Sequence, residues 1–237
     1  MIKKIIKNKK NIFEHASNDN SFPEISSAKD FIPDWYKETN RFISGNSVSN
    51  NLPLNMSFKM CSPFLDSFMS GYMLPLPVDI GIDQSVDGPV ISWNSQQTNF
   101  VIRRSLEGNE KLPVPMGCSP NHYVWATQHT FKIPKGYSAL VTHPFNRHDL
   151  PFITQTGIID GEFFVYPGNV PVFFSSTFKG IIKAGTPIAQ ILLFKTENWK
   201  LEKNINIIEN GAVTNKKTIN SAFGYYKNNH WKKKTYE

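Results

Sequence analysis

The chain has 237 residues, of which 40% are hydrophobic and 19% are charged, so it can bury a core and carries too little charge for a disordered chain. No apolar stretch approaches the ~20 residues of a membrane-spanning helix. The lysine-rich first ten residues lack the apolar core of a signal peptide. The two cysteines, Cys61 and Cys118, form no Cys-x-x-Cys pair, which excludes a disulfide scaffold and a structural zinc site and predicts a cytoplasmic protein.

The net charge of +7 is concentrated at the two ends of the chain. Residues 1–10 contain five lysines and no acid, and residues 216–237 contain six lysines and one glutamate. The stretch 11–215 therefore has 15 basic and 18 acidic residues. Reading of DNA bases favours the arginine fork, whereas the chain has four arginines against 22 lysines. The basic ends predict solubilising segments rather than a specific nucleic-acid or membrane partner.

Residues 1–26 are polar and lack periodicity, which predicts a flexible arm. Pro33 and Asp34 suit a first helical turn and Gly45 suits a position after a helix end, so we expect a short helix within residues 30–43. Ser62, Pro63 and Gly71 predict a second short helix in the same way.

Short β-type segments separated by proline and glycine turns follow along the chain. They lie at residues 72–80, 90–93, 99–103, 129–133, 137–141, 163–166, 171–174 and 188–194. We expect the segments 90–93 and 99–103 to form a hairpin. The spacing predicts one mostly β domain over 27–200, a sandwich or barrel, followed by a basic tail over 201–237.

The stretch 131–194 contains a specific order of motifs. A Pro134-Lys-Gly136 turn precedes a strand, the polar loop Pro144-Phe-Asn-Arg-His-Asp-Leu150, the sequence Gly157-Ile-Ile-Asp160 and, after two strands, Gly185-Thr-Pro-Ile-Ala-Gln190. This order resembles the dUTPase and dCTP deaminase superfamily. The resemblance implies a distorted β-barrel (β-clip), here with short N-terminal helices. It also implies a homo-oligomer, with a trimer as the expected state, because trimers of that family build the active site between subunits.

The resemblance implies a nucleotide site on the matching residues. Asp160 matches the catalytic carboxylate that orients a water molecule, and Phe163 matches a tyrosine that packs under the deoxyribose. Gln190 matches a glutamine that contacts the phosphates, and Asn146 and Arg147 lie in the loop that holds the phosphates. The activity implied is nucleotide binding and, in a catalytic version, Mg²⁺-assisted hydrolysis of a phosphoanhydride.

Two departures from the family pattern concern activity. His148 and Asp149 replace the small residues that let the family's loop approach phosphates, and an aspartate beside a triphosphate repels it. The strand at residues 170–174 has no acid where dCTP deaminases carry a glutamate, so deamination is disfavoured.

Other interpretations stay open. Asp160 also suits a tight turn, in which an aspartate bonds its own backbone. A second hypothesis is a non-catalytic oligomerisation module, for example a phage virion component, in which the tails strap neighbouring subunits together. A third places a metal ion on His143, His148 and Asp149, because imidazole and carboxylate groups bind iron, manganese and zinc.

Overall fold

The computed structural model describes residues 11–42, 57–94, 98–105, 107–108, 110–161, 165–166, 168–205, 207–220, 225–234 and 236. Contacts divide the chain into two units. Unit 1 comprises Met1–Ser26 with Tyr72–Thr196, and unit 2 comprises Ser27–Gly71 with Glu197–Glu237. This division differs from the predicted boundaries, because residues 27–71 group with the C-terminal residues.

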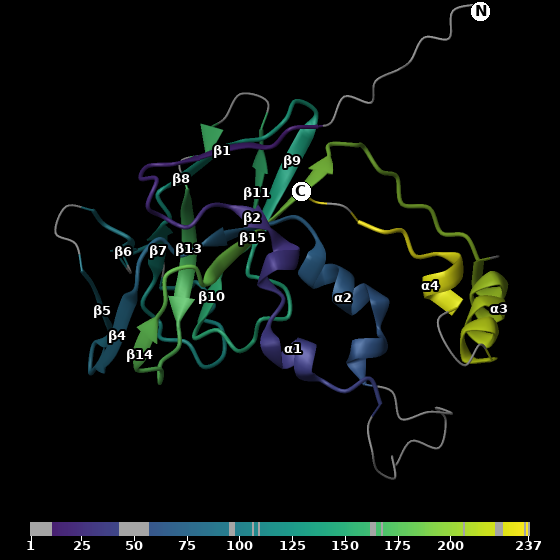
Figure 1. Ribbon diagram of the computed structural model, residues 1–237, viewed down its shortest axis with the longest axis horizontal. Coiled ribbons are helices and arrows are strands. Elements are labelled where there is room, and N and C mark those ends of the chain that lie inside the picture. Colours follow the sequence, from purple (N-terminus) through teal and green to yellow (C-terminus); the bar gives the residue numbers. More distant parts are fainter. Residues whose placement is uncertain are drawn as a thin grey trace, which may run out of the picture. The chain divides into compact units, whose positions relative to one another are not determined.

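The described part of unit 1 consists of antiparallel strands in four sheets (Figure 1). The largest sheet has the order β11-β9-β15-β3-β2, with β2 at Ser26–Ser27, β3 at Tyr72–Pro75, β9 at Tyr137–Thr142, β11 at Gly157–Asp160 and β15 at Pro187–Lys195. A second sheet has the order β10-β13-β7-β6, with β6 at Val101–Arg103, β7 at Tyr123–Ala126, β10 at Phe152–Thr154 and β13 at Asn169–Phe174.

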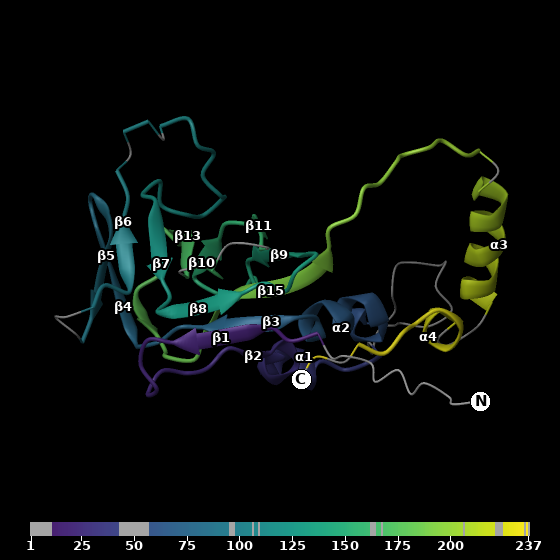
Figure 2. The ribbon, with the colours of Figure 1, turned by 90° about the horizontal axis from the view of Figure 1, so that it is seen from above.

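Two three-stranded sheets complete the described part of unit 1. One has the order β1-β8-β12, with β1 at Glu14–Ser17, β8 at His129–Lys132 and β12 at Val165–Tyr166. The other has the order β14-β4-β5, with β4 at Ile80–Ser85, β5 at Gly88–Trp93 and β14 at Gly180–Ile182. The predicted mostly β fold is confirmed. Figure 2 shows β9 and β15 side by side, as their antiparallel pairing from Gln190–Thr142 to Lys195–Tyr137 requires.

The core of unit 1 is built on aromatic residues from the second sheet. Trp125 of β7 is fully buried, and its ring centroid lies 5.2 Å from that of Phe152 and 5.0 Å from that of Phe174, both edge-on. Edge-to-face contacts of this kind add about 0.5–1.5 kcal/mol beyond the burial of apolar area. All four residues of β7 are buried, which is typical of a strand covered on both faces.

Strand pairing departs from the sequence prediction at two places. The expected hairpin of residues 90–93 with 99–103 is wrong, because β5 pairs with β4 and β6 pairs with β7. The turn from β4 to β5 consists of Val86 and Asp87, and Gly88, which begins β5 opposite Ser85, has a φ of +103°, a conformation that glycine adopts without a steric penalty. Within the predicted arm, β1 pairs with β8 from Glu14–Lys132 to Ser17–His129.

Unit 2 begins with two short helices and two single turns: η1 (Ala28–Phe31), α1 (Asp34–Glu38), η2 (Phe58–Met60) and α2 (Ser62–Met69). The first helix is shorter than predicted, because Thr39 leaves the helical conformation and donates its backbone N–H to the carbonyl of Trp35. Tyr36 and Phe68, whose ring centroids are 5.0 Å apart, are buried and hold α1 against α2.

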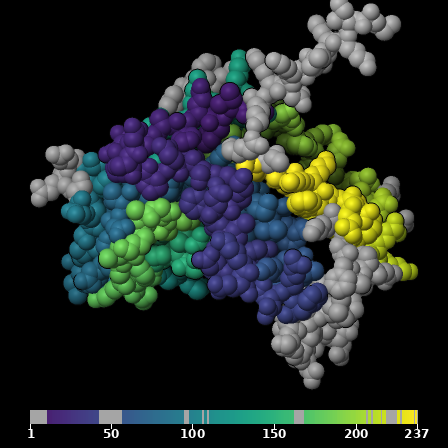
Figure 3. All heavy atoms as spheres, in the orientation of Figure 1, coloured from purple at the N-terminus to yellow at the C-terminus, as the bar shows by residue number. Residues whose placement is uncertain are grey.

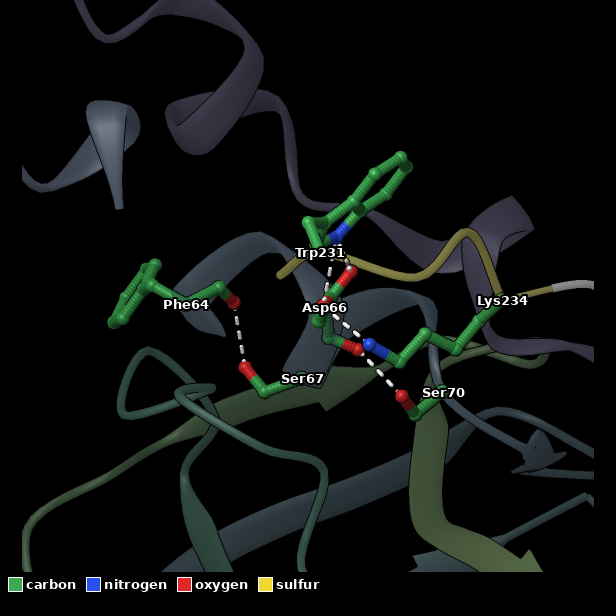
Figure 4. A network of polar contacts seen from close by, with 6 residues as sticks. All are labelled: Phe64, Asp66, Ser67, Ser70, Trp231 and Lys234. Carbon is green, nitrogen blue, oxygen red and sulfur yellow. Dashed lines mark hydrogen bonds and ion pairs between the residues drawn. The ribbon is translucent and has the colours of Figure 1, made fainter. Parts of the chain in front are cut away.

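The C-terminal part of unit 2 contains α3 (Ile207–Asn220) and α4 (Tyr225–Asn229). Beyond α4, two side chains converge on the carboxylate of Asp66 in α2 (Figure 4). The Trp231 indole N–H donates to both carboxylate oxygens at 3.0 and 2.9 Å, and the Lys234 ammonium lies 2.7 Å from one of them. The last part of unit 2 is thus fixed to its first part.

No helix among the residues that the structure describes has the length and apolar character needed to cross a membrane.

Candidate functional site

The loop of residues 143–150 joins β9 to β10, and Gln190 of β15 anchors it. Gln190 pairs with Thr142 in the sheet, and its side chain is completely buried. Its amide oxygen accepts a hydrogen bond from the backbone N–H of Phe145 at 2.9 Å. The structure therefore brings Gln190 together with the loop that contains Asn146 and Arg147. In the isolated chain Gln190 positions this loop and does not face solvent.

His143 ties the same loop to β10. Its Nε2 lies 3.0 Å from the carbonyl oxygen of Arg147, and its Nδ1 lies 3.3 Å from the backbone nitrogen of Thr154. A carbonyl can only accept and a backbone N–H can only donate, so the neutral imidazole with hydrogen on Nε2 satisfies both partners. Burial lowers the pKa of His143, against a backbone hydrogen bond to Arg147 that raises it.

Arg147 and Asp149 form a two-pronged ion pair within the loop. The guanidinium Nε and Nη2 lie 2.8 and 2.9 Å from the two carboxylate oxygens of Asp149. The Arg147 side chain is 12% exposed and that of Asp149 is 39% exposed. Asn146 adopts a φ of +58°, a left-handed conformation that asparagine tolerates better than most residues. The loop thus holds a largely buried planar guanidinium, whose two-pronged face is engaged by a more exposed carboxylate.

Asp160, the predicted catalytic carboxylate, ends the edge strand β11. Its Oδ1 accepts a hydrogen bond from the Ser138 hydroxyl at 2.8 Å, and the Ser138 oxygen lies 2.8 Å from the Thr196 hydroxyl. Because Ser138 uses its one hydrogen for the carboxylate, the Thr196 hydroxyl donates to Ser138. Ser138 is buried, whereas Asp160 is exposed. The hydrogen bond between Ser138 and Asp160 therefore joins the neighbouring strands β9 and β11.

The predicted site residues lie at two ends of β9. Ser138, opposite Asp160, is four residues from Thr142, where the loop begins, and four residues of a strand span about 13 Å. The structure thus brings Asn146, Arg147 and Gln190 together and leaves Asp160 at the far end of the strand. Phe163 lies outside the described residues.

The proposed metal ligands have other partners. Both ring nitrogens of His143 are engaged by backbone groups, and Asp149 pairs with Arg147. Within the described ranges, no group of three or more His, Cys, Asp and Glu side chains could hold a metal ion. No signal in the sequence indicated Ser138, Thr154 and Thr196 as partners of the site residues. These contacts join segments far apart in the sequence, and the register of the paired strands determines them.

A shallow depression of about 480 Å³ lies on the outer face of the sheet β14-β4-β5. Figure 3 shows these strands at the surface, with the blue atoms of β4 and β5 beside the green atoms around β14. Gly81 and Gly180 contribute to its lining, and the exposed pair of Lys179 and Asp83, 3.0 Å apart, lies at it. A depression this open buries little of a ligand. The loop of residues 143–150 is therefore the stronger candidate for the functional site.

The sequence matches no protein-family model and no curated protein. Solved structures similar to the chain include dUTPases of staphylococcal phages. A mutant dUTPase from phage phi11 of S. aureus, described with a structural Mg(II) ion, has a TM-score of 0.36 and 10% identity, covering 82% of this chain and 97% of that chain. A mutant of the Staphylococcus bacteriophage 80alpha dUTPase has a TM-score of 0.35 and 11% identity, with the same coverage.

A second 80alpha dUTPase mutant, with dUpNHpp, has a TM-score of 0.29 and 13% identity, covering 68% of this chain and 98% of that chain. These structures belong to the family that the motifs of residues 131–194 resemble. At these TM-scores and identities the likeness carries no argument about this chain.

Proposed function

We propose that this chain binds a nucleotide or a related phosphorylated ligand, in a site that copies of the chain complete together. The observation that carries the proposal is the two-pronged engagement of Arg147 by Asp149 on a surface loop. A phosphate group presents two oxygens in the same geometry as a carboxylate, and guanidinium binds either one through two parallel hydrogen bonds. A phosphate can therefore take the place of Asp149 on Arg147.

The loop is suited to this exchange because its backbone is held from both sides. Gln190 holds Phe145, and His143 holds both Arg147 and Thr154. A loop fixed before the ligand arrives loses less conformational entropy on binding, which increases affinity. The nucleotide as ligand class comes from the resemblance over residues 131–194.

The second part of the proposal, a site shared between copies, comes from Asp160. A carboxylate that orients water for attack on a phosphate must lie near the group that holds that phosphate. Within one chain Asp160 and the loop are separated by about 13 Å of β9. A second copy that brings its own Asp160 to the loop removes this separation.

Magnesium enters the proposal only with the ligand. Because the described residues offer no group of three metal-binding side chains, we derive no step through a protein-bound metal ion. Mg²⁺ is included in the assay as the counter-ion of a triphosphate.

The test measures binding of deoxynucleoside triphosphates with Mg²⁺ by calorimetry, with dUTP first and inorganic triphosphate as the probe without a base. We expect Arg147→Ala to weaken binding by about 2–5 kcal/mol and Arg147→Lys to restore part of it, because lysine keeps the charge and loses the fork. The matched control is Lys179→Ala, which removes a cation from an ion pair on another sheet. Equal affinity in Arg147→Ala and the parent chain contradicts the proposal.

Subunit mixing tests the shared site. Arg147→Ala and Asp160→Asn each impair the site when present in every copy, and Asn keeps an acceptor for the Ser138 hydroxyl. When the two variants are unfolded and refolded together, mixed oligomers contain some sites with an intact Arg147 and an intact Asp160. We expect mixing to recover dUTP hydrolysis that neither variant has alone, because Asp160 orients the attacking water. Hydrolysis that the parent chain has and that stays absent after mixing, in oligomers proven mixed by mass, contradicts the shared site.

One observation favours the second candidate, a non-catalytic oligomerisation module. Several large apolar side chains of unit 2 are exposed, among them Trp199, Leu201, Ile205, Ile207 and Ile208. Exposed apolar groups gathered on one segment are typical of surfaces that bind other proteins. A stable oligomer by light scattering that binds none of the nucleotides supports this candidate over the first.

A further inference from the structure

His143 links two segments through groups that cannot exchange roles. Its Nε2–H donates to the Arg147 carbonyl within the loop, and its Nδ1 accepts from the Thr154 N–H in β10. Because both partners belong to the backbone, no rotation of a neighbouring side chain can adapt to a change in the imidazole. The contact therefore depends on a single protonation state of one ring.

Protonation of Nδ1 converts an acceptor into a donor that faces the Thr154 N–H. Two donors facing each other lose a hydrogen bond and repel, while the bond from Nε2 to Arg147 survives. The change thus acts on one specific tie, the one between the loop and β10. The bond from Phe145 to Gln190 contains no group that titrates near neutral pH, so it stays.

We infer that His143 is a positioning residue whose neutral form couples the loop of residues 143–150 to β10, and that its protonation releases this coupling and weakens ligand binding at Arg147. The effect on ligand binding rests on the proposed function, whereas the release of the loop does not. Ligand binding at the same site is thereby regulated by pH.

The charged groups around His143 determine how readily it titrates. Arg147 and His148 disfavour its cationic form, and Asp149 favours it. From β10 the ring of Phe152 packs edge-on at 5.8 Å, and from β15 the neutral amide of Gln190 holds the loop. Burial, the largest influence, keeps the pKa of His143 below its ordinary value. The ring is therefore neutral at neutral pH, and the tie is intact there.

The direct test follows the backbone amide of Thr154 by NMR in the full chain without ligand, between about pH 7.5 and about pH 5. We expect its chemical shift to titrate with a midpoint below the ordinary histidine value. We also expect its hydrogen exchange, corrected for the intrinsic rate, to become at least about tenfold faster in acid, as loss of one hydrogen bond allows. A Thr154 shift that does not titrate, together with unchanged exchange, overturns the inference.

Two variants separate the two bonds of the ring. In His143→Asn the amide oxygen lies near the position of Nδ1 and keeps an acceptor for Thr154, whereas in His143→Gln the amide nitrogen lies near Nε2 and keeps a donor for Arg147. Neither side chain titrates. We expect the Thr154 amide to exchange slowly at both pH values in His143→Asn. In His143→Gln we expect it to exchange fast at both. The control is His15→Gln, which removes a histidine of β1 and should leave the titration of Thr154 unchanged.

Ligand binding is then measured with dUTP and Mg²⁺ at the same two pH values. Protonation of the terminal phosphate affects all proteins equally, so the measured quantity is the difference between the parent chain and His143→Asn. We expect acid to weaken binding to the parent chain about tenfold more than binding to His143→Asn. An identical loss in both overturns the inference. A Thr154 titration in a chain that binds no nucleotide at either pH contradicts the proposed function and leaves the coupling by His143 intact.

Discussion

The indole N–H of Trp231 lies 3.0 and 2.9 Å from the two carboxylate oxygens of Asp66, a residue 165 positions earlier in the chain. Lys234 adds its ammonium to one of these oxygens, and the Asp66 side chain is 11% exposed. A carboxylate this far removed from water is stable only while it is paired. Trp231 is therefore a structural anchor, within a basic tail whose lysines alone predict a solubilising segment.

Removing the indole donor should loosen the C-terminal segment. We expect Trp231→Phe to destabilise unit 2 by about 1–3 kcal/mol, because a buried carboxylate loses a hydrogen bond while the ring is kept. Faster hydrogen exchange at residues 225–234 and a lower midpoint of urea unfolding are the measurements. Trp199→Phe is the matched control, since Trp199 is 87% exposed. Equal behaviour of the two variants contradicts the anchor.

Two glycines with positive φ should respond differently to alanine. At Gly88 a Cβ would overlap the side-chain amide nitrogen of Asn121. Asn121 is buried, its amide nitrogen donates to the Asp87 carbonyl, and its amide oxygen accepts from Arg103. At Gly117, with a φ of +78°, a Cβ has no neighbour within 4 Å. We expect Gly117→Ala to cost about 1–2 kcal/mol for the backbone alone, and Gly88→Ala to cost clearly more. Urea unfolding of both variants measures the difference, and equal costs would refute the steric argument.

Acid should destabilise unit 1 through His129. Its ring is fully buried, and neither of its nitrogens has a hydrogen-bond partner among the described residues. Burial lowers its pKa most, Glu24 opposes this effect, and His15 adds to it. Below the ordinary histidine pKa of about 6.5 the unfolded chain binds a proton that the folded chain does not, so stability falls as pH decreases towards the lower folded value.

The test compares urea unfolding of the parent chain and His129→Leu at several pH values. One such histidine contributes a slope of at most about 1.4 kcal/mol per pH unit. His122 and His143 also have pKa values lowered mainly by burial, so part of the slope remains in the variant. A slope identical to that of the parent chain would show that His129 is not responsible.

Gln190 should matter through the backbone that it holds. Gln190→Leu keeps a similar volume and leaves the Phe145 N–H without its acceptor, which we expect to cost about 1–3 kcal/mol and to speed the hydrogen exchange of the Phe145 amide. Gln190→Glu keeps an acceptor but buries a charge at neutral pH. Its stability should recover as the pH falls and the carboxyl becomes neutral. Unchanged Phe145 exchange in Gln190→Leu is the contrary result.

The strand content of unit 1 could be predicted from the sequence, because short runs of β-branched and aromatic residues between proline and glycine turns favour strands by local preference. Sequence reasoning missed the pairing of β4 with β5, although a glycine in the short segment Val86-Asp-Gly88 was a usable turn signal. It also missed β1, whose three exposed residues of four give no apolar alternation. Pairing partners depend on tertiary contacts that a pattern in one segment does not contain.

For the candidate site, the sequence predicted which loop contains the site residues, but not the hydrogen-bond partners of each side chain. The motif order placed Gln190 and Arg147 in one site, and β15 does bring them together. The sequence could not indicate that both nitrogens of His143 face backbone groups, or that Asp160 bonds to Ser138, because both facts depend on the register of neighbouring strands. The separation of Asp160 from the loop follows from that register too.

The contact between Asp66 and Trp231 also sets an order of events during synthesis. Unit 1 supplies most of the residues between these two, which lie 165 positions apart, and a ribosome that adds about 5–20 residues per second needs on the order of ten seconds to make them. Until then the carboxylate of Asp66 lacks the two partners that Trp231 and Lys234 supply. The β-rich unit therefore emerges and can fold before Trp231 and Lys234 are made, and their contact with Asp66 forms only afterwards.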